Sequence, residues 1–308
     1  MTTVRGIAEV GGTCSSRPTT GAVSTDSATT PEPSSTRLPR MSSAPSGPVV
    51  DALIKTERPA SSVAPSKTRL ALTWQASLIN AAANIAALAD KHRDWAATLT
   101  PDEKEALRAY RTPGVYYILN KFLRSGELPP QKPWQHFTPE GLRDLAYLLD
   151  AALRRAPTLD QPVVVYRSVV LPNRLSAQGP RLNGQWLEDR GFMSTTIAPE
   201  VIKTFEQKRL TKPDQGHSPV CVAITIPAGA SAAYIEAALG GSGEQEVLLP
   251  LGKPCGQALR FTSDVETIDG ISLVAATLVP DGAKANWHPA FPAGWKPTGF
   301  SLRDFFDT

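Results

Sequence analysis

The sequence is poor in the residues from which disulfides and metal sites are built. Among its 308 residues, three are cysteine and four are histidine. Cys14, Cys221 and Cys255 are far apart and odd in number, so neither a disulfide framework nor a paired-cysteine zinc site is indicated. The histidines form no HExxH pattern and no pair at a metal-binding spacing. We therefore expect no metal centre.

Two further absences exclude classes of partner. The formal net charge is only +3, which is too small for the broad basic surface that nucleic-acid binding requires, so no nucleic-acid partner is expected. No uninterrupted apolar stretch is long enough to span a bilayer. Asn80, Asn84 and Asp90 interrupt the Ala-rich stretch that begins at Ala76, and this pattern predicts an amphipathic helix.

Residues 1–70 lack aromatic side chains and are rich in Ser, Thr and Pro. Such a segment buries too little apolar surface to offset its conformational entropy, so we predict that it is disordered. It contains eight basic and five acidic residues and therefore carries the whole excess of positive charge. It has no apolar h-region typical of a Sec signal peptide. Two interpretations stay open: a plain linker, or an export tail read by a secretion machine that accepts unfolded N-termini.

One stretch within this tail has the pattern of an acylation site. If translation began at Val10, Gly11 would occupy the position that is myristoylated, and Cys14 would be available for palmitoylation. Two acyl chains anchor a protein stably, whereas one binds a membrane only marginally. The hypothesis that follows is association with a host membrane through Gly11 and Cys14.

Helical patterns come first along the chain and strand patterns follow. Thr100-Pro101-Asp102-Glu103 is a capping box with proline at the first helical position, and it predicts a helix start. This order predicts an α+β domain over residues 71–280, onto which the aromatic-rich residues 281–308 pack back. The other predicted helices cover 115–123, 138–156 and 198–208, and the predicted strands cover 162–167, 191–196, 220–226, 246–251 and 272–279.

Two glutamates stand at the start of the predicted strand in the segment GSGEQEVLLP. If Glu244 and Glu246 lay on one extended strand, they would point to the same face with Cα atoms roughly 6.5–7 Å apart. The simplest interpretation is a solvated strand end with one glutamate in a salt bridge. Paired carboxylates at the rim of a core also suit chemistry at a sugar carbon, either in a glycoside hydrolase or in glycosyl transfer from NAD.

Three segments in order resemble the motifs of one enzyme family. Tyr166-Arg167, the segment Phe192-Met193-Ser194-Thr195-Thr196 and the segment GEQEVLLP over 243–250 resemble the arginine, Ser-Thr-Ser and E-x-E motifs of the R-S-E class of mono-ADP-ribosyltransferases. Residues 107–124 are similar to its helical "Y…I-N-x-x-L-R" block, and 222–229 to its "I-x-x-P-x-G" strand end. The resemblance covers roughly residues 70–280, and it is the ordered set, not any single motif, that is specific.

The resemblance implies a fold and a set of cofactor-binding residues. The fold would be a helical lobe followed by two packed, mostly antiparallel sheets, with NAD in the cleft between them. Arg167 would contact the NAD phosphates, which suits a planar, permanently charged guanidinium. Ser194 would hold Glu246 and border the ribose, with Thr195 beside it, and Phe205 would line the nicotinamide pocket. Ser168 stands where glycine is common in the family, so its side chain would crowd the nicotinamide amide or its backbone would serve unchanged.

The resemblance also assigns the two glutamates and their surroundings. Glu246 would bind the nicotinamide ribose and stabilise the cationic centre as nicotinamide departs. Glu244 would orient and deprotonate the acceptor, and a glutamate at this position in the family implies that the acceptor is arginine. Tyr234 would line the acceptor loop. Thr196 replaces the last serine of the Ser-Thr-Ser motif and keeps its hydroxyl.

The function expected on these grounds is transfer of ADP-ribose from NAD to an arginine of a host protein. The tail and single domain resemble type III-secreted effectors of plant-pathogenic bacteria, so we expect a secreted, monomeric protein whose tail directs export. Two alternatives stay open. One is a degenerate transferase fold that binds a host protein or peptide without turnover, and the other is an NAD glycohydrolase that uses water as acceptor.

Overall fold

The computed structural model describes residues 67–128, 137–172, 181–210, 217–241, 243–251 and 257–279. Residues 1–66 of the predicted tail, which include Gly11 and Cys14, and the aromatic residues 281–308 lie outside these ranges. The predicted tail boundary at residue 70 is too late, because residues 67–70 already belong to the first helix and Leu70 is buried in the core. Within the described ranges no helix is long and apolar enough to cross a membrane. The elements are α1 (Lys67–Thr98), α2 (Pro101–Arg111), α3 (Val115–Ser125), α4 (Pro139–Arg154), β1 (Val163–Pro172), β2 (Trp186–Asp189), β3 (Met193–Thr196), α5 (Pro199–Leu210), β4 (His217–Ile226), β5 (Ala233–Tyr234), α6 (Glu236–Leu239), β6 (Glu246–Leu249), β7 (Gln257–Phe261), β8 (Glu266–Ile268) and β9 (Ile271–Val279).

The helix starts follow from local capping chemistry. At the start of α2, the Glu103 N–H donates to Thr100 Oγ1 at 3.2 Å, and the Thr100 N–H donates to Glu103 Oε2 at 2.9 Å. This reciprocal pair confirms the predicted capping box. Thr138 caps α4 in a similar way by accepting from the Gly141 N–H at 3.0 Å. Helix α3 ends at Gly126, whose φ of 76° is readily adopted only by glycine.

The strands form one hydrogen-bonded path in the order β2-β7-β9-β4-β1-β3-β6-β5, with β8 paired to β9. All neighbours are antiparallel except β4 and β9, which run parallel. Strand β1 pairs with β4 along its whole length, but with β3 only at Tyr166 and Thr196. The two predicted sheets are therefore joined through one residue pair. We call β2-β7-β9-β4-β1 the larger half and β3-β6-β5 the smaller half.

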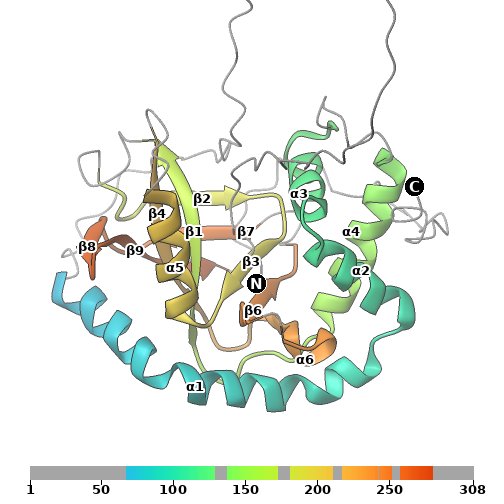
Figure 1. Cartoon of the computed structure of the whole chain (residues 1–308), viewed down its shortest axis with the longest axis horizontal. Coiled ribbons are helices and arrows are strands. Elements are labelled where there is room, and N and C mark those ends of the chain that lie inside the picture. Colours follow the sequence, from blue (N-terminus) through green and yellow to red (C-terminus); the bar gives the residue numbers. More distant parts are fainter. Residues whose placement is uncertain are drawn as a thin grey trace, which may run out of the picture.

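Three apolar clusters hold the layers together. The first joins α2, α3 and α4 to the smaller half through residues such as Phe192 and Leu248. The second lies between the two halves and includes Val165 and Val222 from the larger half and Val247 from the smaller half. The third packs α1 and α5 onto the larger half. In Figure 1, α2 to α4 gather on one side of the sheet, and α1 runs along the base of the molecule. The predicted α+β architecture, with helices preceding the strands, is confirmed.

Trp74 links α1 to the junction between the halves. Its side chain is fully buried, its indole N–H donates to Asp269 Oδ2 at 2.9 Å, and its ring meets that of Tyr166 edge to face with centroids 5.2 Å apart. Since Tyr166 makes the only pair between β1 and β3, Trp74 supports the residue that joins the sheet halves.

We expect Trp74→Ala to lower the free energy of unfolding by about 3–5 kcal/mol, because it removes a large buried ring and leaves a cavity. Urea unfolding followed by circular dichroism measures the change. Ile79→Ala on the same helix is the control. The Ile79 side chain is 79% exposed, so its removal should change stability by less than about 0.5 kcal/mol. Equal effects of the two variants would contradict the packing described.

Candidate active site

Glu246 is the first residue of β6 and is buried, with 3% of its surface exposed. It faces Thr196 across the β3–β6 pair. The Ser194 hydroxyl donates to Glu246 Oε1 at 2.5 Å, so the contact expected between these two residues is present. Thr195 does not join them, since its hydroxyl donates to the Val247 carbonyl at 2.6 Å and is buried. Ser194 thus fixes one carboxylate oxygen of Glu246, and Thr195 fastens β3 to β6.

Glu244 precedes the strand and does not lie on it. Gly243 and Gln245, on either side of it, have φ of 79° and 51°, so the chain turns at both. The extended geometry considered from the sequence, with both glutamates on one strand face, therefore does not occur. Glu244 is itself buried, with 6% exposed, and its carbonyl accepts a 2.6 Å hydrogen bond from Thr196 Oγ1. The two glutamates are close in the chain but are held by different contacts.

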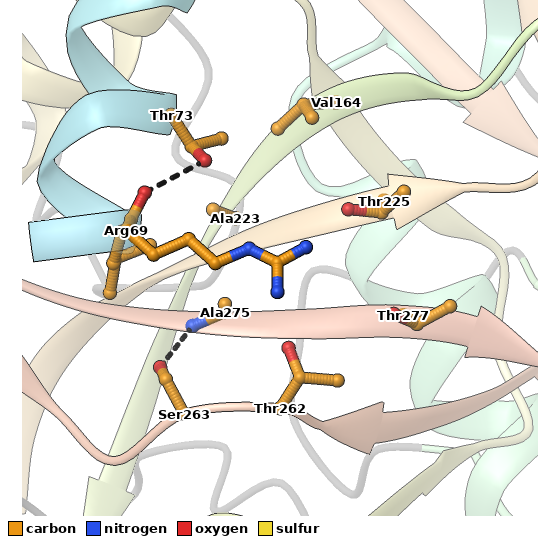
Figure 2. Close-up of a pocket in the computed structure, with 10 residues that line it drawn as sticks. Arg69, Thr73, Val164, Ala223, Thr225, Thr262, Ser263, Ala275 and Thr277 are labelled. Atoms are coloured by element: carbon orange, nitrogen blue, oxygen red, sulfur yellow. Dashed lines mark hydrogen bonds between the residues drawn. The ribbon is translucent and has the colours of Figure 1, made fainter. Parts of the chain in front are cut away.

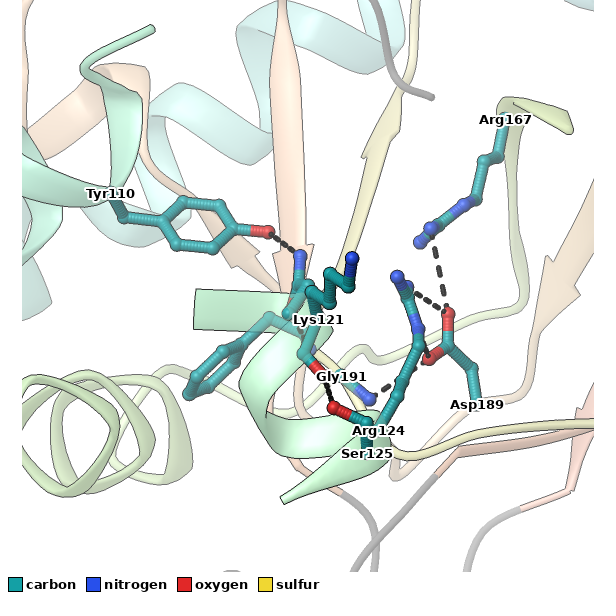
Figure 3. A network of polar contacts seen from close by, with 9 residues as sticks. Tyr110, Lys121, Arg124, Ser125, Arg167, Asp189 and Gly191 are labelled. Carbon is teal, nitrogen blue, oxygen red and sulfur yellow. Dashed lines mark hydrogen bonds and ion pairs between the residues drawn. The ribbon is translucent and has the colours of Figure 1, made fainter. Parts of the chain in front are cut away.

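Arg167 lies on β1, one residue beyond the junction with β3, and forms part of a charged cluster with Asp189 and Arg124. The Arg124 guanidinium, on α3, donates two hydrogen bonds of 2.8 and 2.9 Å to the Asp189 carboxylate. Arg167 Nη2 approaches the same carboxylate at 3.5 Å, and the Gly191 N–H donates to it at 2.8 Å. Figure 3 shows the two guanidinium groups converging on Asp189 from different elements. Two arginines and one aspartate leave one positive charge in excess.

The electrostatics of this cluster favour its charged state. Burial alone would raise the pKa of Asp189, but the Arg124 guanidinium, assisted by Arg167 and the Gly191 N–H, holds that pKa below its usual value. Arg167 is 7% exposed, and its Nη1 has no hydrogen-bond partner. An unpaired buried guanidinium nitrogen is costly unless an anion completes it. The cluster therefore offers an anion one unpaired guanidinium nitrogen and one positive charge in excess.

Tyr110 and Asn120 connect the helical lobe to this site. The Asn120 amide donates to the Tyr110 hydroxyl at 3.1 Å and accepts from the Phe192 N–H at 2.7 Å. Burial, and next the charge of Glu246, raise the pKa of Tyr110, so its hydroxyl stays neutral.

Gly191 is required beside Tyr110 and Asn120, because a Cβ there would lie 2.6 Å from Asn120 Oδ1. Asn120 and Arg124 belong to the helical block noted in the sequence, whereas no local pattern marked Asp189.

The structure places two other predicted residues away from the Arg167 guanidinium. Strand alternation turns Ser168 to the opposite face of β1, where its fully buried hydroxyl donates to the Glu206 carboxylate of α5. The side chain therefore does not crowd the Arg167 side, and only the backbone of Ser168 is left for a ligand there. Phe205 packs in the cluster under α1 and α5 together with Tyr166 and Cys221.

Tyr234 lies on β5 next to the loop that carries Glu244. Its hydroxyl donates to Gln245 Oε1 at 2.5 Å. Burial and then the nearby charge of Glu236 raise the pKa of Tyr234 to about 12, so it acts as a neutral donor. The structure thus places Tyr234 at the loop predicted for the acceptor, and the contact runs through Gln245.

A separate hollow of about 320 Å³ lies between the first turns of α1 and the larger half of the sheet. Figure 2 shows Arg69 reaching over a floor that includes Thr225 and Thr277. Its described lining contains no carboxylate and none of the predicted site residues. In the described ranges there is also no group of three or more His, Cys, Asp or Glu side chains that could hold a metal ion.

Comparison with known proteins identifies the family. The family model described as ADP-ribosyltransferase exoenzyme matches residues 89–255, which include the charged cluster and both glutamates. The chain belongs to this family. ADP-ribosyltransferases take ADP-ribose from NAD, so NAD is the co-substrate. None of the curated proteins matches the chain.

Solved structures of ADP-ribosyltransferase toxins resemble the chain at low identity. Plx2a from Paenibacillus larvae is 20% identical, with 62% of this chain and 92% of that chain covered and a TM-score of 0.45. Vis toxin from Vibrio Splendidus is 19% identical, with 73% and 91% covered and a TM-score of 0.46. BECa of C. perfringens, solved with NADH, is 19% identical, with 70% and 49% covered and a TM-score of 0.48.

We expect Asp189→Asn to lower the free energy of unfolding by about 3–5 kcal/mol at pH 7, because it leaves two arginines without their buried carboxylate. The pKa of Asp189 is lower in the folded state. Its stabilising effect is therefore present above the unfolded pKa of about 3.9 and is lost as the pH falls through the folded pKa.

Urea unfolding at several pH values tests this. The difference between wild type and Asp189→Asn should narrow below about pH 4. Asp160→Asn is the control, since this aspartate pairs with Lys91 while 86% exposed, and such pairs contribute about 0–1 kcal/mol. A difference at Asp189 that does not depend on pH would show that its charge is not what stabilises the cluster.

Proposed function

We propose that this ADP-ribosyltransferase transfers ADP-ribose from NAD to an arginine side chain of a host protein, as a member of the R-S-E class. The observation that carries the proposal is the hydrogen bond from Ser194 to Glu246, with Arg167 on the adjoining strand and Glu244 two residues earlier. These are the three motifs of that class, and they meet around one junction in the sheet.

Arg167 binds the pyrophosphate of NAD in this proposal. Its buried position and the excess positive charge of the cluster with Asp189 and Arg124 favour a dianionic ligand. Asp189 limits the freedom of both guanidinium groups, so the ligand meets a site that is already ordered. The nicotinamide ribose then extends from Arg167 toward Glu246.

Glu246 supports the departure of nicotinamide. The bond between the ribose C1′ and the nicotinamide nitrogen breaks, the electron pair leaves with nicotinamide, and a positive charge develops on the ribose. A carboxylate that Ser194 already orients stabilises this charge without having to reorganise. Glu246 is buried, so its interaction with the cationic centre is little screened by water.

Glu244 selects and activates the acceptor. A carboxylate can bind a guanidinium with two parallel hydrogen bonds, which favours arginine over other side chains. As the guanidinium nitrogen attacks C1′, Glu244 accepts the proton that this nitrogen loses. The bond formed joins ADP-ribose to arginine, and nicotinamide is the other product.

The proposed setting is a host cell. The residues that precede α1 serve as the export tail of a secreted bacterial effector, on the basis of their composition. Association with a host membrane through Gly11 and Cys14 remains a prediction, as does the monomeric state.

The test is incubation of the full-length protein with labelled NAD and agmatine, a small mimic of arginine. We expect wild type to produce ADP-ribosyl-agmatine. Glu246→Gln should reduce both nicotinamide release and transfer by at least about a hundredfold, because stabilisation of the cationic centre is lost. Glu244→Gln should lose transfer but keep nicotinamide release, since only the acceptor step needs its charge.

Two controls make the result specific. Glu105→Gln removes a carboxylate from an ion pair with Arg108 on the surface of α2, and both rates should stay at the wild-type level. Nicotinamide release without labelled agmatine in wild type would favour an NAD glycohydrolase. Absence of both activities, together with absence of NAD binding, would favour a module that only binds a host protein or peptide.

A further inference from the structure

The loop that carries Glu244 has an unfavourable backbone conformation at a residue that is not glycine. Gln245 has a φ of 51°, in the left-handed region that residues other than glycine rarely adopt. Such conformations persist only where the surroundings hold them, and they concentrate at functional sites. Since Gln245 lies directly between the two glutamates, whatever holds it also sets the direction of Glu244.

Three polar groups of Gln245 are engaged. Its N–H donates to Glu236 Oε1 at 2.6 Å, and its side-chain Oε1 accepts from the Tyr234 hydroxyl at 2.5 Å. Its carbonyl accepts from the Ile197 N–H at 3.1 Å. Of these three contacts, only the one with Glu236 involves a carboxylate. Hydrogen bonds to a carboxylate are stronger than those between neutral groups, so Glu236 contributes most to holding Gln245.

Glu236 is well placed to act as a fixed anchor. It is the first residue of α6, and only 8% of its surface is exposed. Helix α6 ends at Gly240, whose N–H donates to the Glu236 carbonyl at 2.9 Å. Arg111 from α2 donates to the Gly240 carbonyl at 3.1 Å. At the other end, the N–H of Ile235, which precedes the helix, donates to the Glu246 carbonyl at 3.2 Å. Both ends of the short helix are therefore tied down, and the carboxylate of Glu236 holds Gln245 from a constrained backbone.

The contacts that hold Glu246 do not involve the Glu236 side chain. Ser194 holds its carboxylate, the Ile235 backbone N–H holds its carbonyl, and β3 and β6 pair continuously from Met193 and Leu249 to Thr196 and Glu246. Loss of the contact between Glu236 and Gln245 would therefore loosen the turn at Gln245 and change the direction of the Glu244 side chain, although Thr196 still holds the Glu244 carbonyl, while Glu246 keeps its place. The effects on the two glutamates can be separated.

We propose that Glu236 is a positioning residue that directs Glu244, and that it thereby sets how ADP-ribose is partitioned between the arginine acceptor and water. This inference rests on the proposed function, because it assigns Glu244 to the acceptor. Glu236 acts through the Gln245 N–H.

The experiment compares transfer to agmatine with nicotinamide release in full-length Glu236→Ala and Glu236→Gln. Alanine removes the acceptor of the Gln245 N–H, so the ratio of transfer to release should fall about tenfold, which corresponds to about 1.4 kcal/mol. Nicotinamide release itself should change less than about twofold, because Glu246 keeps its contacts. Glutamine keeps an oxygen that accepts the same hydrogen bond, so Glu236→Gln should restore most of the ratio.

A second measurement reports the loop without using activity. In wild type the Gln245 amide should exchange slowly with solvent deuterium, because Glu236 holds it. In Glu236→Ala it should exchange at least about tenfold faster, while the amides of Val247 and Leu248 in β6 stay protected. Glu103→Ala is the matched control, since it removes a buried carboxylate from α2 that pairs with Arg155. That variant should lose stability without changing the ratio or the exchange of Gln245.

An equal fall of transfer and release in Glu236→Ala would overturn the proposal, as would an unchanged ratio. Failure of Glu236→Gln to restore the ratio would also count against the proposal, because the proposal requires only that residue 236 accepts a hydrogen bond from the Gln245 N–H. If wild type releases nicotinamide but never labels agmatine, the arginine acceptor is wrong. In that case exchange of the Gln245 amide still decides whether Glu236 holds the loop.

Discussion

The site depends on one junction in the sheet. Strands β1 and β3 are joined only where Tyr166 pairs with Thr196. The arginine, serine and glutamate that we assign to NAD lie within two residues of this pair or directly opposite it. Arg167 follows Tyr166, Ser194 precedes Thr196 by two residues, and Glu246 faces Thr196 across β6. Because β1 leaves β3 directly after the junction, Arg167 pairs with Val222 of β4 on one side but has no paired residue on the β3 side. The fold thus brings an arginine, a serine and a glutamate together from three strands.

Burial of charge is the second constraint on the site. Arg167, Asp189, Glu244 and Glu246 are all nearly excluded from solvent, and a buried charge is costly unless it is paired or hydrogen-bonded. Asp189 meets this cost by sharing its carboxylate between two arginines and a backbone N–H. In the proposed function, the pyrophosphate of NAD matches the excess positive charge and the unpaired Arg167 nitrogen. The architecture is that of an ADP-ribosyltransferase, and its buried polar cluster carries one positive charge in excess.

The sequence made two kinds of feature predictable: helix caps that depend on neighbouring residues, and site contacts between residues of recognisable motifs. The capping box at Thr100 is local, and the structure forms it. The contact between Ser194 and Glu246 followed from the motifs, and it too is present. The left-handed turn at Gln245 was not predictable, because glutamine carries no preference for it and the residues that hold it come from other elements.

Asp189 and Glu236 escaped prediction for a related reason. Each acts through contacts with residues distant in the sequence or through backbone N–H groups, and no short pattern records these. The side-chain contacts of Ser168 and Phe205 were likewise not predictable from the motifs. Strand alternation sends Ser168 to Glu206, and packing places Phe205 with Tyr166 and Cys221.

The most direct test of the account is NAD binding by titration calorimetry to the Glu246→Gln protein, in which turnover is suppressed. Adding Arg167→Ala should weaken binding by at least about tenfold, because a charge-assisted contact to phosphate is lost. Adding Arg69→Ala, which alters the separate hollow under α1, should leave the affinity unchanged. Unchanged affinity with Arg167→Ala, or equal losses with both substitutions, would contradict the claim that NAD binds at the junction of β1 and β3.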